Sequence, residues 1–258
     1  MTVRRLFERL NEKIPRSLSY EWDNDGLMCC PDSEREVRRV LVALDATAEV
    51  CERAIREGYD LILTHHPFIF KGLRSIDDEA PVSAKAIALI KAGISVMSFH
   101  TRLDALEGGV NDSLSKALGL SGVEVFDGEG MPIGRVGELD EAMSLEDFAM
   151  RVKEALGCPF VLVSDAGLRV KRVAVLGGEG GDFVREARAA GADTYLSGRL
   201  GYHTMTDAPD VIDRPINLIE AGHFYTEQVV CAALRDMVRE ADAEIVCDIY
   251  NSNRIKSI

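Results

Sequence analysis

The feature that most constrains the fold of this sequence is a pattern that occurs twice. Residues 37–64 and 170–197 align without a gap, and each reads as strand, helix, glycine turn and strand. Two β-α-β patterns predict an α/β protein with largely parallel strand pairing. The match fits either an internal duplication or the likeness shared by all β-α-β units. We expect two similar α/β halves, residues 1–125 and 126–258, with the C-terminal segment packing back on the first.

Further strand and helix patterns alternate along the whole chain. Apolar stretches predict strands at 40–44, 61–64, 95–98, 173–176, 194–197 and 216–219. Amphipathic spacing predicts helices at 2–13, 47–57, 80–92, 109–118, 144–156, 180–190 and 224–240. The run from Ser144 to Asp147 resembles a capping box, with Asp in place of Glu or Gln.

Composition limits the functional classes open to the chain. Its 258 residues carry a net charge of −13, which disfavours binding to nucleic acid or to anionic membranes. No apolar run approaches the ~18 residues of a membrane helix, and the start lacks an apolar leader. We therefore expect a cytoplasmic protein. The six cysteines show no CxxC spacing, so neither a disulfide framework nor a cysteine metal site is expected.

All five histidines follow predicted strands closely, at positions 65, 66, 100, 203 and 223. Ligands of open α/β sheets sit beyond the carboxyl ends of the strands. Adjacent side chains of a strand point to opposite faces, so His65 and His66 are expected to reach two different ions of a close pair. The sequence therefore predicts a metal site at the strand ends.

Two carboxylates accompany these histidines at helical spacing. Asp104 follows His100 by four residues, and Glu227 follows His223 by four. We expect His65, His66, Asp104, His223 and Glu227 to hold two divalent ions, which imidazole and carboxylate allow to be Zn, Fe, Mn or Ni. Glu227 is able to bridge them. Such an open pair suits activation of water for hydrolysis, with His100 and His203 as candidate catalytic residues.

A glycine-rich stretch between a predicted strand and helix leaves two interpretations open. Residues 177–181 read GGEGG, which fits a phosphate cradle at a helix N-terminus or an ordinary tight loop. The stretch matches neither the dinucleotide fingerprint nor the P-loop.

Five segments together resemble the GTP cyclohydrolase I type 2 homologue family, also described as dinuclear-metal-centre hexameric proteins. The segments are EWDNDGL at 21–27, VALDAT at 42–47, LILTHHPFIF at 61–70, HTRLDALEGGVND at 100–112 and AGHFYTEQ at 221–228. The resemblance implies the same five metal ligands, with Glu227 bridging. It also implies two interlinked α/β domains with the metal site in the cleft between them, and a ring-shaped homohexamer.

Two residues depart from the pattern of that family. Asp25 stands where an apolar or small residue is usual, and Arg199 stands where a glutamate is usual. His203 matches a family histidine that faces the cleft.

Two functions from different classes follow. The first is a metal-dependent hydrolase acting on a nucleotide-like or phosphate-bearing small molecule. The second is a metal-binding scaffold or metal-handling protein that regulates partners without turnover.

Overall fold

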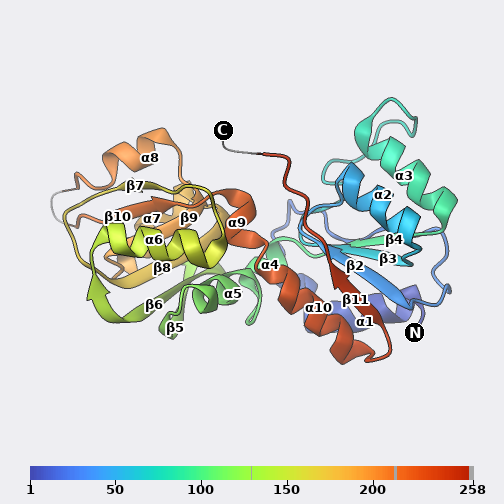
Figure 1. The fold of residues 1–258 in the computed structure, drawn as a ribbon, viewed down its shortest axis with the longest axis horizontal. Helices are drawn as coiled ribbons and strands as arrows, with labels where there is room; N and C mark the ends of the chain where they lie inside the picture. Colours follow the sequence, from blue (N-terminus) through green and yellow to red (C-terminus); the bar gives the residue numbers. More distant parts are fainter. Residues whose placement is uncertain (129, 212–213, 256–258) are drawn as a thin grey trace. The chain divides into compact units, whose positions relative to one another are not determined.

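The computed structural model describes residues 1–128, 130–211 and 214–255 (Figure 1). The chain divides into two compact units. Unit 1 comprises Met1–Leu103 and Cys231–Arg254, and unit 2 comprises Asp104–Val230 with Ile255. Two of the boundaries fall within helix α4 (Thr101–Ala105) and at the start of helix α10 (Val230–Ala241), and the third follows Arg254.

Unit 1 is built on a five-stranded sheet of order β1-β4-β3-β2-β11. The strands are β1 (Gly26–Cys29), β2 (Arg39–Ala43), β3 (Leu61–Thr64), β4 (Ser95–Ser98) and β11 (Val246–Ile249). Strands β11, β2, β3 and β4 are parallel, whereas the edge strand β1 is antiparallel to β4. Because β3 and β4 are covered on both faces, every one of their residues is buried.

Helices cover both faces of this sheet (Figure 1). The helices are α1 (Val3–Lys13), α2 (Ala48–Glu57), α3 (Pro81–Ala92) and α10, with a short 3-10 turn at Arg16–Leu18. Thr47 caps the start of α2 by accepting from the backbone N–H of Val50, and Gly58 ends the helix in the left-handed conformation. The core between the sheet and helices α2 and α3 includes Ile62 and Leu89.

Unit 2 is built on a six-stranded sheet of order β5-β6-β8-β9-β10-β7. The strands are β5 (Ser121–Gly128), β6 (Met131–Met143), β7 (Leu162–Ser164), β8 (Val170–Glu179), β9 (Thr194–Arg199) and β10 (Asn217–Glu220). The helices are α5 (Val110–Ala117), α6 (Leu145–Leu156), α7 (Val184–Ala189), α8 (Tyr202–Asp207) and α9 (His223–Glu227), with a 3-10 turn at Gly181–Phe183. Its core joins α5 and α6 to β8 through Leu114, Phe148 and Val173.

The twice-occurring sequence pattern folds the same way in both units. Val40 pairs with Leu61 across β2 and β3, and Val173 pairs with Thr194 across β8 and β9, at the aligned positions. An aspartate before the second strand repeats as well. Asp60 accepts from the backbone N–H groups of residues 38 and 39, and Asp193 accepts from those of residues 171 and 172. The expectation of an α/β fold with two similar β-α-β cores is confirmed.

Three details differ from the sequence prediction. Parallel pairing holds only for the central strands and β11, because β1, β5, β6 and β7 pair antiparallel at the sheet edges. The single helix expected at 224–240 is two helices, α9 and α10, separated at residues 228–229. The helix expected at 180–190 begins as a 3-10 turn. The Ser144 cap is present, and its hydroxyl contacts both the N–H and the carboxylate of Asp147.

Candidate metal centre

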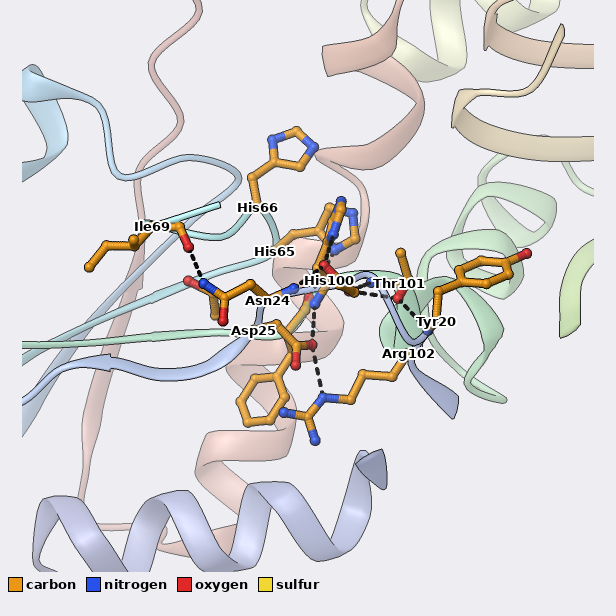
Figure 2. Close-up of polar contacts among 12 residues, drawn as sticks. Tyr20, Asn24, Asp25, His65, His66, Ile69, His100, Thr101 and Arg102 are labelled. Atoms are coloured by element: carbon orange, nitrogen blue, oxygen red, sulfur yellow. Dashed lines mark hydrogen bonds and ion pairs between the residues drawn. The ribbon is translucent and has the colours of Figure 1, made fainter. Parts of the chain in front are cut away.

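Three histidines gather at the carboxyl ends of two neighbouring strands of unit 1 (Figure 2). His65 and His66 follow β3, and His100 follows β4, which lies parallel to β3. One nitrogen from each ring lies within 4.8 Å of the other two. His65 is fully buried, whereas the side chains of His66 and His100 are 21% and 19% exposed. The group is therefore partly accessible to a ligand, through His66 and His100.

Each of the three imidazoles is held through its Nδ1 atom. Nδ1 lies 3.0 Å from the carbonyl oxygen of Phe99 in His65, 2.8 Å from Asp45 in His66 and 2.8 Å from Asp23 in His100. Carbonyl and carboxylate oxygens only accept, so Nδ1 carries the proton and the Nε2 lone pair is the one suited to a metal. This arrangement is the usual support of metal-binding histidines.

Asp23 ties the His100 loop to the turn at residues 20–23. Its carboxylate accepts from the backbone N–H and the hydroxyl of Thr101, at 3.1 and 2.6 Å, besides contacting His100. Burial raises the pKa of Asp23, but the hydrogen bonds and charge from His100 and the bonds from Thr101 outweigh it and lower that pKa to about 2. Asp23 thus stays ionised and holds His100 in one orientation.

Asp25 forms a buried ion pair with Arg102. Its carboxylate lies 2.9 Å from the guanidinium of Arg102 and accepts from the backbone N–H of His100 at 3.0 Å (Figure 2). It also lies 2.5 Å from the guanidinium of Arg16. Arg102 is only 1% exposed. The charge of Asp25 is therefore matched, and its carboxylate fixes the backbone beside His100.

The other three predicted ligands lie in unit 2. His223 and Glu227 occupy one face of α9, with Nε2 of His223 3.0 Å from Oε2 of Glu227. A carboxylate oxygen of Asp104, from α4, lies within 4.8 Å of one from Glu227. Glu227 is 4% exposed. Gly222 allows the chain to leave β10 and begin α9 at once, because its φ of 86° suits glycine.

Two glycines of the glycine-rich stretch pack closely against Glu227. Gly177 and Gly178 belong to the end of β8, and a Cβ atom at Gly178 would overlap the carboxylate of Glu227. The backbone N–H of Gly178 donates to Thr226 Oγ1 at 3.1 Å. These two glycines are thus explained by the close approach of α9.

His203 and Arg199 contact other side chains, Tyr202 and Glu179 respectively. His203 is exposed on α8, with its ring 5.4 Å from that of Tyr202. Among the described residues it belongs to no set of potential metal ligands. Arg199, at the end of β9, lies 3.6 Å from Glu179, and both side chains are exposed.

A small pocket of about 170 Å³ adjoins His66. Asp45, Thr47 and Lys85 contribute polar groups to its lining. The Lys85 ammonium donates to the carbonyl of Ala46 at 2.6 Å, and burial lowers the pKa of Lys85. The pocket therefore carries both an ammonium, from Lys85, and a carboxylate, from Asp45, in its lining.

Sequence reasoning missed the two carboxylates that orient the histidines. Asp45 follows β2 as His66 follows β3, and Asp23 precedes β1. A signal was present, since both lie in the motifs at 21–27 and 42–47. A carboxylate directly after a buried strand next to a histidine-bearing strand is a reasonable sign of such support.

Fold and site together define a mixed α/β protein with groups of histidine and carboxylate able to hold a metal ion. The chain belongs to the Duf34/NIF3 (NGG1p interacting factor 3) family, which it matches over residues 1–256. A GTP cyclohydrolase 1 type 2 homolog of Clostridium perfringens is 32% identical, covering 95% of each chain. One from Clostridium acetobutylicum is 34% identical over 88% of this chain and 85% of that protein. The family resemblance noted from the motifs is confirmed.

A solved structure agrees with this assignment. The crystal structure of a Staphylococcus aureus hypothetical protein matches with a TM-score of 0.88 and 29% identity, covering 100% of this chain and 99% of the other. In the part of the chain that the structure describes, no helix has both the length and the apolar character needed to cross a membrane.

Proposed function

We propose that this chain binds two divalent metal ions through His65, His66, Asp104, His223 and Glu227 and hydrolyses a nucleotide-like or phosphate-bearing small molecule. The observation that carries the proposal is the anchoring of three clustered imidazoles through Nδ1. One structural histidine often makes such a bond, but its presence in both adjacent ligands, His65 and His66, beside a third ring oriented alike, fits metal ligation. The donor chemistry suits Zn, Fe, Mn or Ni.

We further propose, on the resemblance to the family, that Glu227 bridges the two ions. A homohexamer is proposed on the family resemblance.

Individual residues of the chain would have separate roles in the reaction. When bound, a metal pair supplies activation of a water molecule and polarisation of a substrate oxygen. His100, oriented by Asp23, would hold or move a proton beside the reacting group. His203 would orient substrate from α8. Lys85, in the pocket beside His66, would bind an anionic group of the substrate.

Elemental analysis of purified protein tests the metal site. We expect about two metal ions per chain in the wild type, and a loss in His65→Ala and Glu227→Ala. Glu154→Ala is the matched control, because Glu154 is an exposed acid on α6. Circular dichroism would verify that each variant folds. Full metal content in both ligand variants would contradict the proposed site.

Turnover tests the hydrolase. Metal-loaded protein is incubated with a panel of nucleotides and phosphoesters, beside Asp104→Ala and Glu154→Ala. We expect hydrolysis that survives in Glu154→Ala and is lost in Asp104→Ala. Equal activity in the Asp104 variant would contradict the mechanism.

A metal-handling or scaffold protein is the second candidate. The Arg199–Glu179 pair favours it, because a cation occupies the position at which a glutamate is usual. Metal content without turnover on the panel, with partner capture that chelation abolishes, would favour this function over hydrolysis.

A further inference from the structure

We propose that Trp22 and Phe70 form an aromatic platform on which a planar heteroaromatic ring of the ligand, such as a purine base, stacks beside the histidines of unit 1. This inference deepens the proposed function and rests on it for the chemistry at the metal ions. It assigns the recognition of the ring to residues that bind no metal.

The platform is a cluster of rings in contact with His100. The indole of Trp22 lies 6.2 Å from the ring of Phe70 and 6.4 Å from that of His100, both at steep angles. Phe70 also lies 6.1 Å from His100. Edge-to-face contacts at these separations are favourable. A ring stacked on the indole would therefore lie next to the histidine group.

Trp22 is exposed although the protein has a core large enough to bury it. It is the only tryptophan of the chain, and the residue is 60% exposed, while Phe70 is 48% exposed. Tyr20 stacks on the indole at 5.4 Å with an angle of 11° between the rings. A stacked pair that remains open to solvent offers a flat surface on which a third ring can continue the stack.

The platform is held rigidly, so little conformational entropy would be lost on binding. Thr101 secures both ends of the Trp22 turn, because its Oγ1 accepts from the Tyr20 N–H at 3.2 Å and donates to Asp23 at 2.6 Å. The Asn24 side chain donates to the carbonyl of Ile69 at 2.6 Å, which joins this turn to the Phe70 loop (Figure 2). Preorganisation of this kind favours a binding site over an incidental exposed side chain.

A heteroaromatic ring is the occupant that fits these surroundings best. Aromatic side chains bind bases through their flat faces, and His66 with Lys85 would accommodate a phosphate on the same molecule. A small ligand carrying both features would use the platform and the pocket together.

Fluorescence of Trp22 tests the platform directly, because no other tryptophan contributes to the signal. Purified metal-containing protein is titrated with guanosine 5′-monophosphate and, as the ring-free control, with ribose 5-phosphate. We expect saturable quenching by the nucleotide and none by the sugar phosphate. By calorimetry, Trp22→Ala and Phe70→Ala should each weaken nucleotide binding ~10-fold, and Trp22→Phe should weaken it less. Phe160→Ala, an exposed aromatic residue of unit 2, should have no effect.

Metal content separates this inference from the proposed function. Trp22→Ala and Phe70→Ala should retain the wild-type metal content, whereas His65→Ala should lose it. Unchanged nucleotide affinity in both platform variants would overturn the platform while leaving the metal proposal intact. A change in sedimentation coefficient with unchanged nucleotide affinity would instead identify the patch as a contact between copies of the chain, and would also overturn it. Quenching in protein without metal would support the platform, because its residues bind no metal, and elemental analysis alone would decide the metal proposal.

Discussion

The β2-α2-β3 segment of unit 1 and the β8-α7-β9 segment of unit 2 have the same backbone pairing but different residues at their ends. After the second strand, unit 1 has His65 and His66, and the aligned positions of unit 2 are Gly198 and Arg199. Buried, largely apolar strands and the repeated aspartate are common to both segments. The comparison indicates that the residues within the strands specify the pairing of this β-α-β unit, whereas the residues at the carboxyl ends of the strands differ between the two units.

The polar pairs at these ends differ in character. His66 and Asp45 lie 2.8 Å apart and are partly buried, so the carboxylate orients the imidazole. Arg199 and Glu179 lie 3.6 Å apart with side chains 65% and 68% exposed. Exposed ion pairs contribute little to stability. One strand end thus carries a supported candidate ligand, and the other carries a surface ion pair.

The largest effect is expected at Asp25. Gly26 and Leu162 pair with the last residues of β4 and β10, so Asp25 and Val161 precede the edge strands at equivalent positions. Asp25→Ala leaves Arg102 buried without its carboxylate and should lower the free energy of unfolding by ~3–5 kcal/mol. Val161→Ala removes only partly buried apolar surface and should lower it by ~1 kcal/mol. Urea denaturation measures both, and equal losses would contradict the assigned role of the ion pair.

Gly198→Ala tests why unit 2 has no histidine at the position of His65. A Cβ atom at Gly198 would lie 2.5 Å from the Gly178 carbonyl and 2.8 Å from the Cα atom of His223. We expect a loss of ~3 kcal/mol in unfolding free energy from overpacking, together with displacement of α9. Gly72→Ala is the control, because the space around Gly72 is open. Wild-type stability in Gly198→Ala would show that α9 shifts without penalty.

The different roles of the two polar pairs predict different effects on metal binding. Asp45→Ala removes the support of His66 and should weaken metal affinity ~10–100-fold, as loss of such partners usually does. Glu179→Ala should leave the affinity unchanged. Competition with a chromophoric chelator measures both constants. If both variants lose affinity equally, the two pairs have equivalent roles.

The smallest effects are expected at the repeated aspartates. Asp60→Asn and Asp193→Asn keep an acceptor for the backbone N–H groups but lose the charge, so each should lower the free energy of unfolding by ~1 kcal/mol. Because the two carboxylates share no partner, the double variant should lose the sum. Chemical denaturation of the three variants measures whether the carboxylates of Asp60 and Asp193 contribute equally to the free energy of unfolding.

Much of the fold could be predicted because its central strands follow local rules. The expected strands at 61–64 and 95–98 coincide with β3 and β4, whose continuous apolar runs mark buried parallel strands. The edge strands were missed. β5 alternates poorly, with most of its residues exposed, and β7 has only three residues. Their pairing comes from neighbours distant in the sequence.

The candidate site, like the fold, could be predicted only in part. The histidines after β3 and β4 and the spacing of His223 and Glu227 could be read directly, since strand ends and helical periodicity place them. The support of the histidines by Asp23 and Asp45 and the close approach of Gly178 to Glu227 were not predicted, because each depends on a contact between segments distant in the sequence.

Residue type and spacing alone specified the α/β class, the twofold β-α-β pattern and the candidate ligands, because strand and helix periods are local properties of the chain. Tertiary packing decided which atom of each imidazole is anchored, which carboxylates stay charged in the interior and where an indole remains exposed. Those outcomes depend on burial and on hydrogen-bond partners from other strands and loops. These segments come together only when the chain folds.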